Sequence, residues 1–155
     1  MAPDHAYPTL EAVGSGRTID VAHLDRPAVF ICFAEATQGG ADPVEAAVRA
    51  RYSAGQVLVG HVIDLHSVPS LFRGVARGIL NQEHAKAVAE LPGGEIAEDY
   101  VVMLPDWDGA FVNALGLDDV SERLGVAVFA QDGTLVGTAQ SDDVPGETLR
   151  LLDRM

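Results

Sequence analysis

The stretch Ala28–Pro43 reads AVFICFAEATQGGADP and joins an apolar run, a glycine-containing bend and the start of a helix. The run Ala28–Phe33 lacks polar alternation, which is typical of a strand buried on both faces of a parallel sheet. Asp42, Pro43 and Glu45 predict an N-cap, a first-turn proline and a capping-box partner. Because free N–H groups of a first helical turn face such a bend, binding sites often lie there.

The chain continues with a second β-rich run, Gln56–Leu65, after a helix that is expected to end at Gly55. Strand, helix and strand with short joints predict a right-handed parallel crossover. A second helix is expected from about Ser70 to Glu90, and a Pro-Gly-Gly sequence at 92–94 ends it. Its apolar residues fall on one side, at Leu71, Phe72, Val75, Ile79 and Leu80.

The remaining predicted elements are short and are separated by turn residues. They are a short edge strand or hairpin in Tyr7–Ala22, a strand at Tyr100–Leu104, a turn at Pro105–Gly109, a helix at Ala110–Leu115 closed by Gly116, a hairpin of Val126–Ala130 and Thr134–Thr138 around Asp132 and Gly133, and a terminal helix at Glu147–Met155.

Length and composition predict one domain over residues 1–155, with residues 1–6 as a frayed terminus. Hydrophobic residues make up 48% and charged residues 21%, which is typical of an ordinary globular chain. The net charge of −13 argues against nucleic acid and against an anionic membrane surface as partners. The longest apolar runs are too short to span a bilayer.

Cys32 is the single cysteine, so no disulfide can form within the chain. This suits a reducing compartment, and no secretory-signal pattern opens the sequence, so we expect a cytoplasmic protein.

The element order resembles the thioredoxin fold, and more narrowly its redoxin branch of peroxiredoxin-like and thiol-reductase-like domains. The resemblance is carried by Arg26–Glu35 (RPAVFICFAE), which looks like the strand leading into the thioredoxin active-site loop, and by Leu104–Ala110 (LPDWDGA), Ala114–Leu117 and Phe129–Val136 (FAQDGTLV). It implies an α/β three-layer sandwich, with a central mixed sheet of about four to five strands and helices on both faces.

The departures from this family bear directly on function. On the alignment just given, the Cys-x-x-Cys motif falls on Thr37–Gly40, which reads TQGG, and Leu124 or Gly125 stands where the family has a cis-proline. Thiol–disulfide exchange needs a thiolate that attacks a disulfide sulfur, and a threonine hydroxyl cannot replace it. We therefore expect no dithiol oxidoreductase or peroxidase activity.

The first hypothesis is a redox-inactive binding or chaperone-like module that uses the former active-site face. Its partner would be a protein, a peptide or a small molecule, and no cofactor is predicted. The expected ligand-binding residues are Glu35, Thr37, Gln38, Gly39, Gly40, Leu124 and Gly125. Backbone N–H groups of such a loop can cradle a polar ligand, although the same glycines also serve simply to turn the chain. Glu35 and Asp42 would oppose a strongly anionic ligand.

The second hypothesis is a non-redox enzyme or a metal-binding protein built on the same scaffold. Strand alternation places Asp64 and His66 on one face and His61 on the other, so only the former pair can share a proton or a metal. A metal would need a third group, for which Glu83 or His84 is the nearest candidate in sequence. The alternative is that these histidines only cap or hydrogen-bond.

A third hypothesis makes Cys32 a lone redox sensor or modification site. A reactive cysteine must be accessible, whereas a cysteine inside an apolar strand usually behaves as a small buried hydrophobic residue with a raised thiol pKa.

The helix at 70–90 and the following turn carry further candidates. Arg73 and Arg77 lie one turn apart and could bind a carboxylate or phosphate together, or pair with neighbouring acids. Gly74 and Gly78 indicate a tight helix contact, which would allow a homodimer interface. Trp107 is either an exposed interface anchor or is folded back onto the edge of the sheet.

Overall fold

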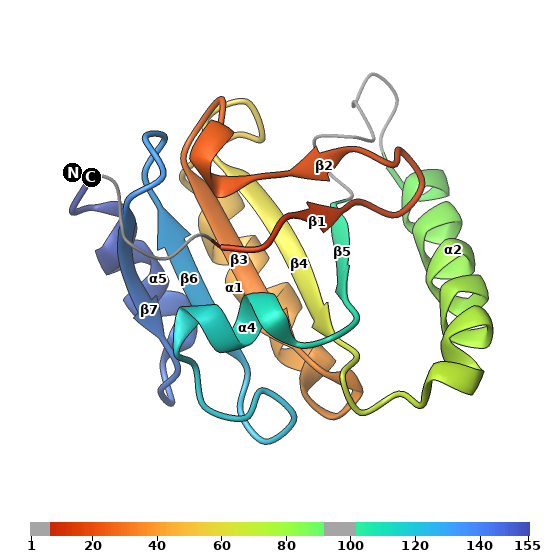
Figure 1. Cartoon of the computed structure of the whole chain (residues 1–155). Helices are drawn as coiled ribbons and strands as arrows, with labels where there is room; N and C mark the ends of the chain where they lie inside the picture. The colour runs from red at the N-terminus through yellow and green to blue at the C-terminus, as the bar shows by residue number, and fades with distance from the viewer. Residues whose placement is uncertain (1–6, 92–101) are drawn as a thin grey trace.

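The computed structural model describes residues 7–91 and 102–155, so the predicted frayed terminus at 1–6 lies outside the described residues. Its centre is a five-stranded mixed sheet in the order β5-β4-β3-β6-β7 (Figure 1). The strands are β3 (Ala28–Phe33), β4 (Leu58–Asp64), β5 (Met103–Asp106), β6 (Gly125–Phe129) and β7 (Leu135–Ala139). Strands β3, β4 and β5 run parallel, while β6 and β7 are antiparallel to their neighbours.

Strand β3 is the central strand that its unbroken apolar sequence predicts. All of its residues are buried, with β4 paired in parallel on one side and β6 antiparallel on the other. Alternate side chains enter the two halves of the core, since Phe30 packs with Phe111 and Phe129 on one face while Ile31 packs with Val44 on the other.

Helices and a hairpin cover the two faces of this sheet and make the three layers that the resemblance implied. Helices α1 (Ala41–Arg49) and α5 (Val144–Leu152) pack on one face. Helix α4 (Ala110–Leu115) and the hairpin of β1 (Leu10–Glu11) and β2 (Thr18–Ile19) cover the other, and a 3-10 helix, η1 (Val21–His23), follows the hairpin. The fold is therefore an α/β sandwich, as predicted.

The start of α1 differs from the prediction. A 3-10 helix, η2 (Glu35–Gly40), fills the expected bend and runs directly into α1, so Gly40 rather than Asp42 is the N-cap residue. No side chain caps α1, and the predicted capping box is wrong. The cause is a hydrogen bond that Thr37 Oγ1 accepts from the Ala34 N–H. This bond stabilises the 3-10 turn η2 before α1 begins. Helix α1 also ends at Arg49, before the predicted stop at Gly55.

Helix α2 (Arg73–Ala89) follows a 3-10 turn, η3 (Ser70–Phe72), and lies at the edge of the molecule (Figure 1). None of its residues is buried. Most of the apolar side that the sequence predicts does not pack on the sheet, because Leu71, Phe72, Val75 and Ile79 are between 53% and 84% exposed. Its fifth residue, Leu80, is half-buried and packs against the core. We call the four exposed residues, of which two lie on η3 and two on α2, the α2 stripe.

The second half follows the sequence closely, with shifts at element ends. Helix α4 has the predicted bounds and ends at Gly116, whose φ of 75° is left-handed. Strand β5 extends through Pro105 into the predicted turn, and residues 100 and 101 of the predicted strand lie outside the described residues. Helix α5 begins earlier than predicted, because the Asp143 carboxylate accepts a hydrogen bond from the Gly146 N–H. In the described ranges, no helix has the length and apolar character that crossing a membrane requires.

Candidate functional site

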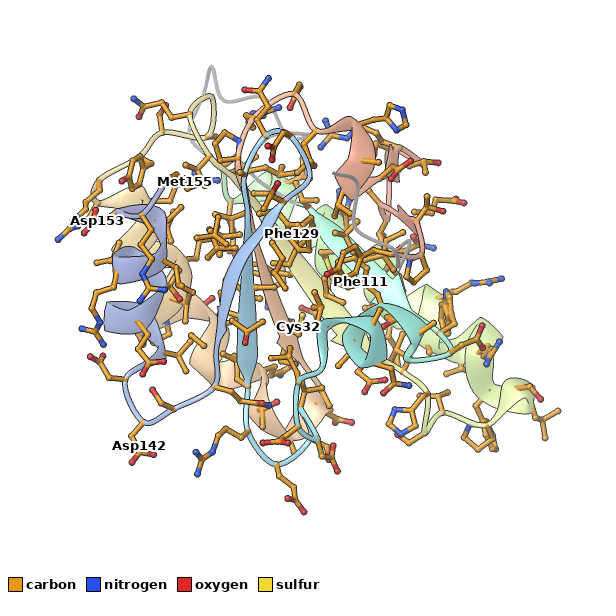
Figure 2. The ribbon with its side chains drawn as sticks, turned by 60° about the vertical axis from the view of Figure 1, so that its left-hand side comes forward. Cys32, Phe111, Phe129, Asp142, Asp153 and Met155 are labelled. Atoms are coloured by element: carbon orange, nitrogen blue, oxygen red, sulfur yellow. The ribbon has the colours of Figure 1, made fainter. Side chains whose placement is uncertain are left out.

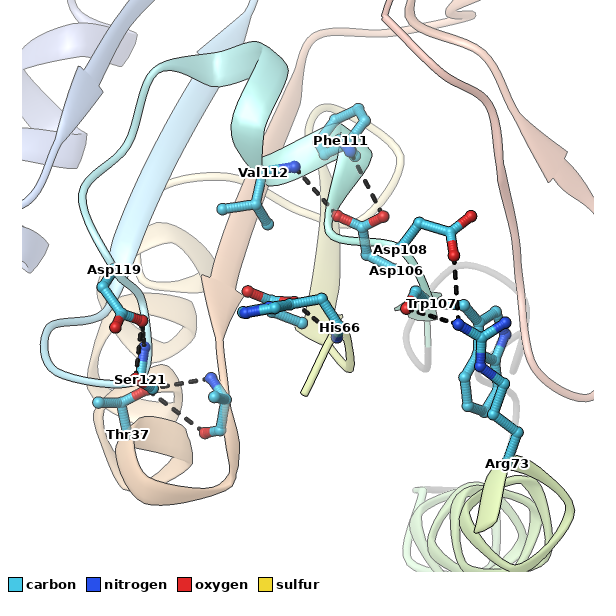
Figure 3. Close-up of polar contacts among 12 residues, drawn as sticks. Thr37, His66, Arg73, Asp106, Trp107, Asp108, Phe111, Val112, Asp119 and Ser121 are labelled. Carbon is cyan, nitrogen blue, oxygen red and sulfur yellow. Dashed lines mark hydrogen bonds and ion pairs between the residues drawn. The ribbon is translucent and has the colours of Figure 1, made fainter. Parts of the chain in front are cut away.

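The carboxyl ends of the parallel strands form one edge of the sheet, and acidic side chains gather there (Figure 3). Asp64 is the last residue of β4 and Asp106 the last of β5, and the register places them side by side. In open α/β sheets, ligands bind outside the carboxyl ends of the strands. We therefore call this region, with the loop at 35–40 and the segment at 119–125, the carboxyl edge.

Asp64 and His66 form a hydrogen-bonded pair at this edge. His66 Nδ1 lies 2.7 Å from Asp64 Oδ1, and the His66 backbone N–H donates to the same oxygen at 3.0 Å. The Asp64 side chain is 8% exposed and that of His66 is 57% exposed, so a shielded carboxylate orients an accessible imidazole. The hydrogen bond to Asp64 raises the pKa of His66, and the charges of Asp64 and Asp119 add to this effect.

Asp106 is a buried carboxylate at the end of β5, where the sequence predicts a turn. Its Oδ2 accepts a hydrogen bond from the Val112 N–H at 3.0 Å, and its Oδ1 accepts one from the Phe111 N–H at 3.4 Å. Burial raises the pKa of Asp106, although these two bonds act in the opposite direction. Asp106 lies within β5, three residues before the N-cap Gly109, so the N-cap pattern did not identify it.

The loop at 35–40 contacts the segment before β6. Thr37 Oγ1 donates to the Val120 carbonyl oxygen at 2.6 Å, and a Cβ added at Gly40 would lie 3.3 Å from Leu124 Cδ1. The structure thus brings together the two segments that were expected to share a ligand. The hydroxyl of Thr37 is, however, already used within the protein.

The seven predicted ligand-binding residues differ in accessibility. Glu35, Gln38, Gly39 and Gly40 are exposed, and Thr37 is half-buried. Leu124 and Gly125 are buried, so they support the loop from below. A ligand on this face would meet the exposed loop residues first.

Cys32 lies in the interior, between the sheet and the layer of α4 (Figure 2). It is 0% exposed and forms no disulfide. Burial raises the pKa of its thiol, and the negative charges of Asp106 and Asp64 raise it further. The sensor hypothesis required an accessible thiol, and this geometry does not provide one.

The predicted metal ligands do not converge. The His84 ring packs against Gly14 in the turn between β1 and β2, whereas His66 lies at the carboxyl edge with Asp64. Within residues 7–91 and 102–155, no group of three His, Cys, Asp or Glu side chains could hold a metal ion. Asp64, His66 and His84 therefore do not form the cluster that the sequence suggested, because α2 carries His84 to the β1–β2 hairpin.

The Trp107 side chain is half-buried and packs against arginine side chains of α2. The guanidinium carbon atoms of Arg73 and Arg77 lie 5.8 Å and 5.0 Å from the centre of its ring. Arg73 Nη2 also donates to Asp108 Oδ1 at 3.2 Å and to the Trp107 carbonyl oxygen at 3.4 Å. Of the two arginines that might have bound an anion together, Arg73 is thus engaged within the protein.

Comparisons with known proteins place this geometry in a recognised fold. No protein-family model matches the sequence, and a search of curated proteins gave no match. The chain is similar to the structure of MTB dsbF, in mixed oxidized and reduced forms, with a TM-score of 0.61 at 16% identity over 99% of this chain and 98% of that one.

Two other solved structures agree with that result. The exposed lipoprotein thioredoxin of Streptococcus pneumoniae gives a TM-score of 0.61 at 15% identity, covering 97% of this chain and 100% of that one. A secreted Mycobacterium tuberculosis disulfide oxidoreductase gives 0.55 at 14% identity and covers 96% of each chain. The thioredoxin-like fold is therefore confirmed, in a chain whose single cysteine leaves no Cys-x-x-Cys motif.

Proposed function

We propose that this protein is a redox-inactive thioredoxin-like domain that binds a partner protein or peptide at its carboxyl edge. The observation that carries the proposal is the state of Thr37. On the resemblance given above, Thr37 falls at the first cysteine of the Cys-x-x-Cys motif, and its hydroxyl donates a hydrogen bond to the Val120 carbonyl oxygen. The only thiol of the chain, on Cys32, is buried with a raised pKa, so no thiolate is available for disulfide exchange.

A binding role is supported by what remains at this edge. The loop still packs on the segment before β6, and Glu35, Gln38 and Gly39 are accessible on it. Asp119 lies nearby, where its carboxylate accepts hydrogen bonds from the Ser121 N–H and hydroxyl. These acidic groups favour a neutral or cationic partner over an anionic one.

The redox part of the proposal is tested by insulin reduction and by peroxide consumption in the presence of thioredoxin. We expect no turnover above that of a Cys32→Ser control. Turnover that disappears in Cys32→Ser would refute redox inactivity.

The binding part is tested with the reduced insulin B chain as a model client. Backbone amide shifts are followed while the client is added, and we expect changes at Glu35–Gly40 and at Ser121–Leu124. Changes confined to β7 and α5, or none at all, would refute a role for the carboxyl edge. Suppression of B-chain aggregation in the same titration would assign the chaperone-like form of this function.

A second candidate is a non-redox enzyme that uses His66 as a proton donor or acceptor. It is favoured by one observation, the accessible imidazole that the shielded Asp64 carboxylate holds in place. The test is a hydrolase substrate panel run on the protein and on His66→Ala. Activity that is equal in both proteins would remove His66 from the mechanism.

The cytoplasmic location stays a prediction. A single buried cysteine is consistent with it, whereas the similar structures include an exposed lipoprotein and a secreted protein. Fractionation of cells that express the full chain decides between these locations.

A further inference from the structure

A groove lies between α2 and the rest of the molecule. None of the residues of the loop at 35–40 lines this groove. Its volume is about 800 Å³, which is within the range of small-molecule and short-peptide sites. Three elements line it: the β1–β2 hairpin, the middle of α2, and the turn between β5 and α4 (Figure 1). It exists because α2 contacts the body through side chains and buries none of its own residues.

One wall of the groove carries a cation that is stacked on an aromatic ring. The Arg77 guanidinium is held 5.0 Å from the centre of the Trp107 ring. Arg73, one turn earlier, pairs with Asp108, whereas Arg77 has no ion pair or hydrogen bond with any described residue. Stacking on an aromatic ring limits the motion of a guanidinium and leaves its N–H donors available for an acceptor.

Polar and apolar groups beside Arg77 define what could accept those donors. Asn81 lies one helical turn further on and also lines the groove, so its amide can bind the same ligand group. Leu80, Val13 and Pro105 add apolar surface. This is a charged and polar anchor next to an apolar wall.

We propose that this groove binds a ligand that carries one carboxylate on an apolar body. The carboxylate is bound by Arg77 and Asn81, and the apolar part lies against Leu80 and Pro105. The free acid of a small molecule and the C-terminus of a peptide share this chemistry.

The charges around the groove select a monoanion. Glu11 and Asp108 also line it, and the chain carries a net charge of −13, so a phosphate dianion would be repelled more strongly than a carboxylate. A single planar guanidinium matches the two oxygens of one carboxylate. The inference is independent of the proposed function, because it uses neither Thr37 nor the exposed loop residues.

The chain supplies its own reporter for this site. Trp107 is the only tryptophan and lines the groove, so its fluorescence reports a ligand there. The probes are 4-phenylbutyrate and N-acetyl-Ala-Ala-Phe, each compared with its carboxamide. We expect a saturable change in Trp107 emission with at least one acid and a weaker response to its amide. Saturation by the small acid alone assigns a small-molecule ligand, and saturation by the peptide alone assigns a peptide C-terminus. No response to either acid would overturn the proposal.

The role of Arg77 is tested by Arg77→Gln, which keeps a polar side chain and removes the charge. We expect affinity for the responding acid to fall about 10- to 100-fold, the range for a lost charge-assisted hydrogen bond. Arg51→Gln is the matched control, because Arg51 pairs with Asp153 and does not line the groove. Unchanged affinity in Arg77→Gln would refute the site.

A second variant separates loss of the anchor from loss of the groove. If Arg77→Gln weakens the acid but binds the amide like the unmodified protein, the anchor is confirmed. If both ligands weaken, Asn81→Ala decides: a several-fold loss of the acid alone supports the proposal, and no loss refutes it.

Discussion

Strand β3 and helix α2 are both rich in apolar residues, yet their surroundings are opposite. Every residue of β3 is buried, and no residue of α2 is. The strand is paired on both sides and covered on both faces, whereas α2 is attached through side-chain contacts such as those of Arg73 with Asp108 and of His84 with Gly14. Apolar sequence therefore specifies the interior in one region and an accessible surface in the other.

This difference separates the part that makes the fold from the part that is available for binding. Residues with many buried contacts resist change, while a peripheral element with few of them can open locally and can accept ligands. The groove and the α2 stripe both belong to the second kind.

The largest predicted effect compares one substitution in each region. Phe30→Ala removes a fully buried ring that lies in edge-to-face contact with Phe111 and Phe129, so unfolding free energy should fall by about 3–5 kcal/mol. Phe72→Ala removes an exposed ring of the α2 stripe, and its effect should stay within about 0.5 kcal/mol. Urea denaturation followed by circular dichroism measures both. Equal losses would mean that α2 is packed in solution.

The second prediction compares neighbouring carboxylates. Asp106→Ala leaves the Phe111 and Val112 N–H groups without their acceptor in a buried place, and we expect a loss of about 1–3 kcal/mol in unfolding free energy. Asp108→Ala removes an exposed pair with Arg73, which should contribute no more than about 1 kcal/mol. The same denaturation experiment compares the two losses of unfolding free energy. A larger loss for Asp108→Ala would contradict the structural role given to Asp106.

The third prediction uses glycines in the two regions. A Cβ at Gly60 of β4 would lie 2.9 Å from Leu104 Cδ1 and 3.0 Å from Phe30 Cδ1, so Gly60→Ala should destabilise by about 1–3 kcal/mol through overpacking. A Cβ at Gly74 or Gly78 meets no atom within 4 Å, so alanine there should stabilise α2 by about 0.5–1 kcal/mol each.

The homodimer predicted from Gly74 and Gly78 is tested by sedimentation velocity of the unmodified protein and of the same α2 variants. If a second copy approaches α2 closely at these glycines, Gly78→Ala should weaken self-association while it stabilises the helix. A monomer at all concentrations in the unmodified protein would remove the homodimer prediction.

The smallest effect concerns His66, in the loop between β4 and η3 that leads into α2. Asp64→Asn should lower the pKa of His66 toward its ordinary value, because the hydrogen bond to Asp64 is the first cause of its elevation. An imidazole resonance followed by NMR against pH measures this, with His23 as an internal control that lies on another element.

The direction of the accompanying stability change follows from the raised pKa. The stabilisation by charged His66 is complete below the pKa of the unfolded chain and is lost as the pH rises through the higher folded value. A His66 pKa that does not move in Asp64→Asn would show that the pair is not formed in solution.

Sequence patterns predicted most elements because those patterns are local. The unbroken apolar run at Ala28–Phe33 predicted the central strand, and the bounds of α4 followed from Gly109 and Gly116 at its ends. Element ends were less certain where a side chain reaches across several residues. Thr37 and Asp143 each shift the start of a helix in this way, and each does so through a single hydrogen bond to a backbone N–H group.

The candidate site was only partly predictable. Asp64 and His66 were found because they are two residues apart, at the end of β4 and in the turn that follows it, whereas Asp106 lies beside Asp64 only through the pairing of β5 with β4. His84 was wrongly grouped with them, since α2 carries it to the hairpin instead. Sequence distance does not report distance across a sheet or along a helix that leaves it.

The sequence by itself determined the thioredoxin-like order of elements, the presence of a single cysteine and the absence of a Cys-x-x-Cys motif, because each is a matter of residue identity or local period. Only the tertiary structure decided that Thr37 is bonded to Val120, that Trp107 lies under Arg77, and that α2 stands away from the sheet to leave a groove. The physical reason is that these features depend on contacts between residues far apart in the chain, which no local pattern encodes.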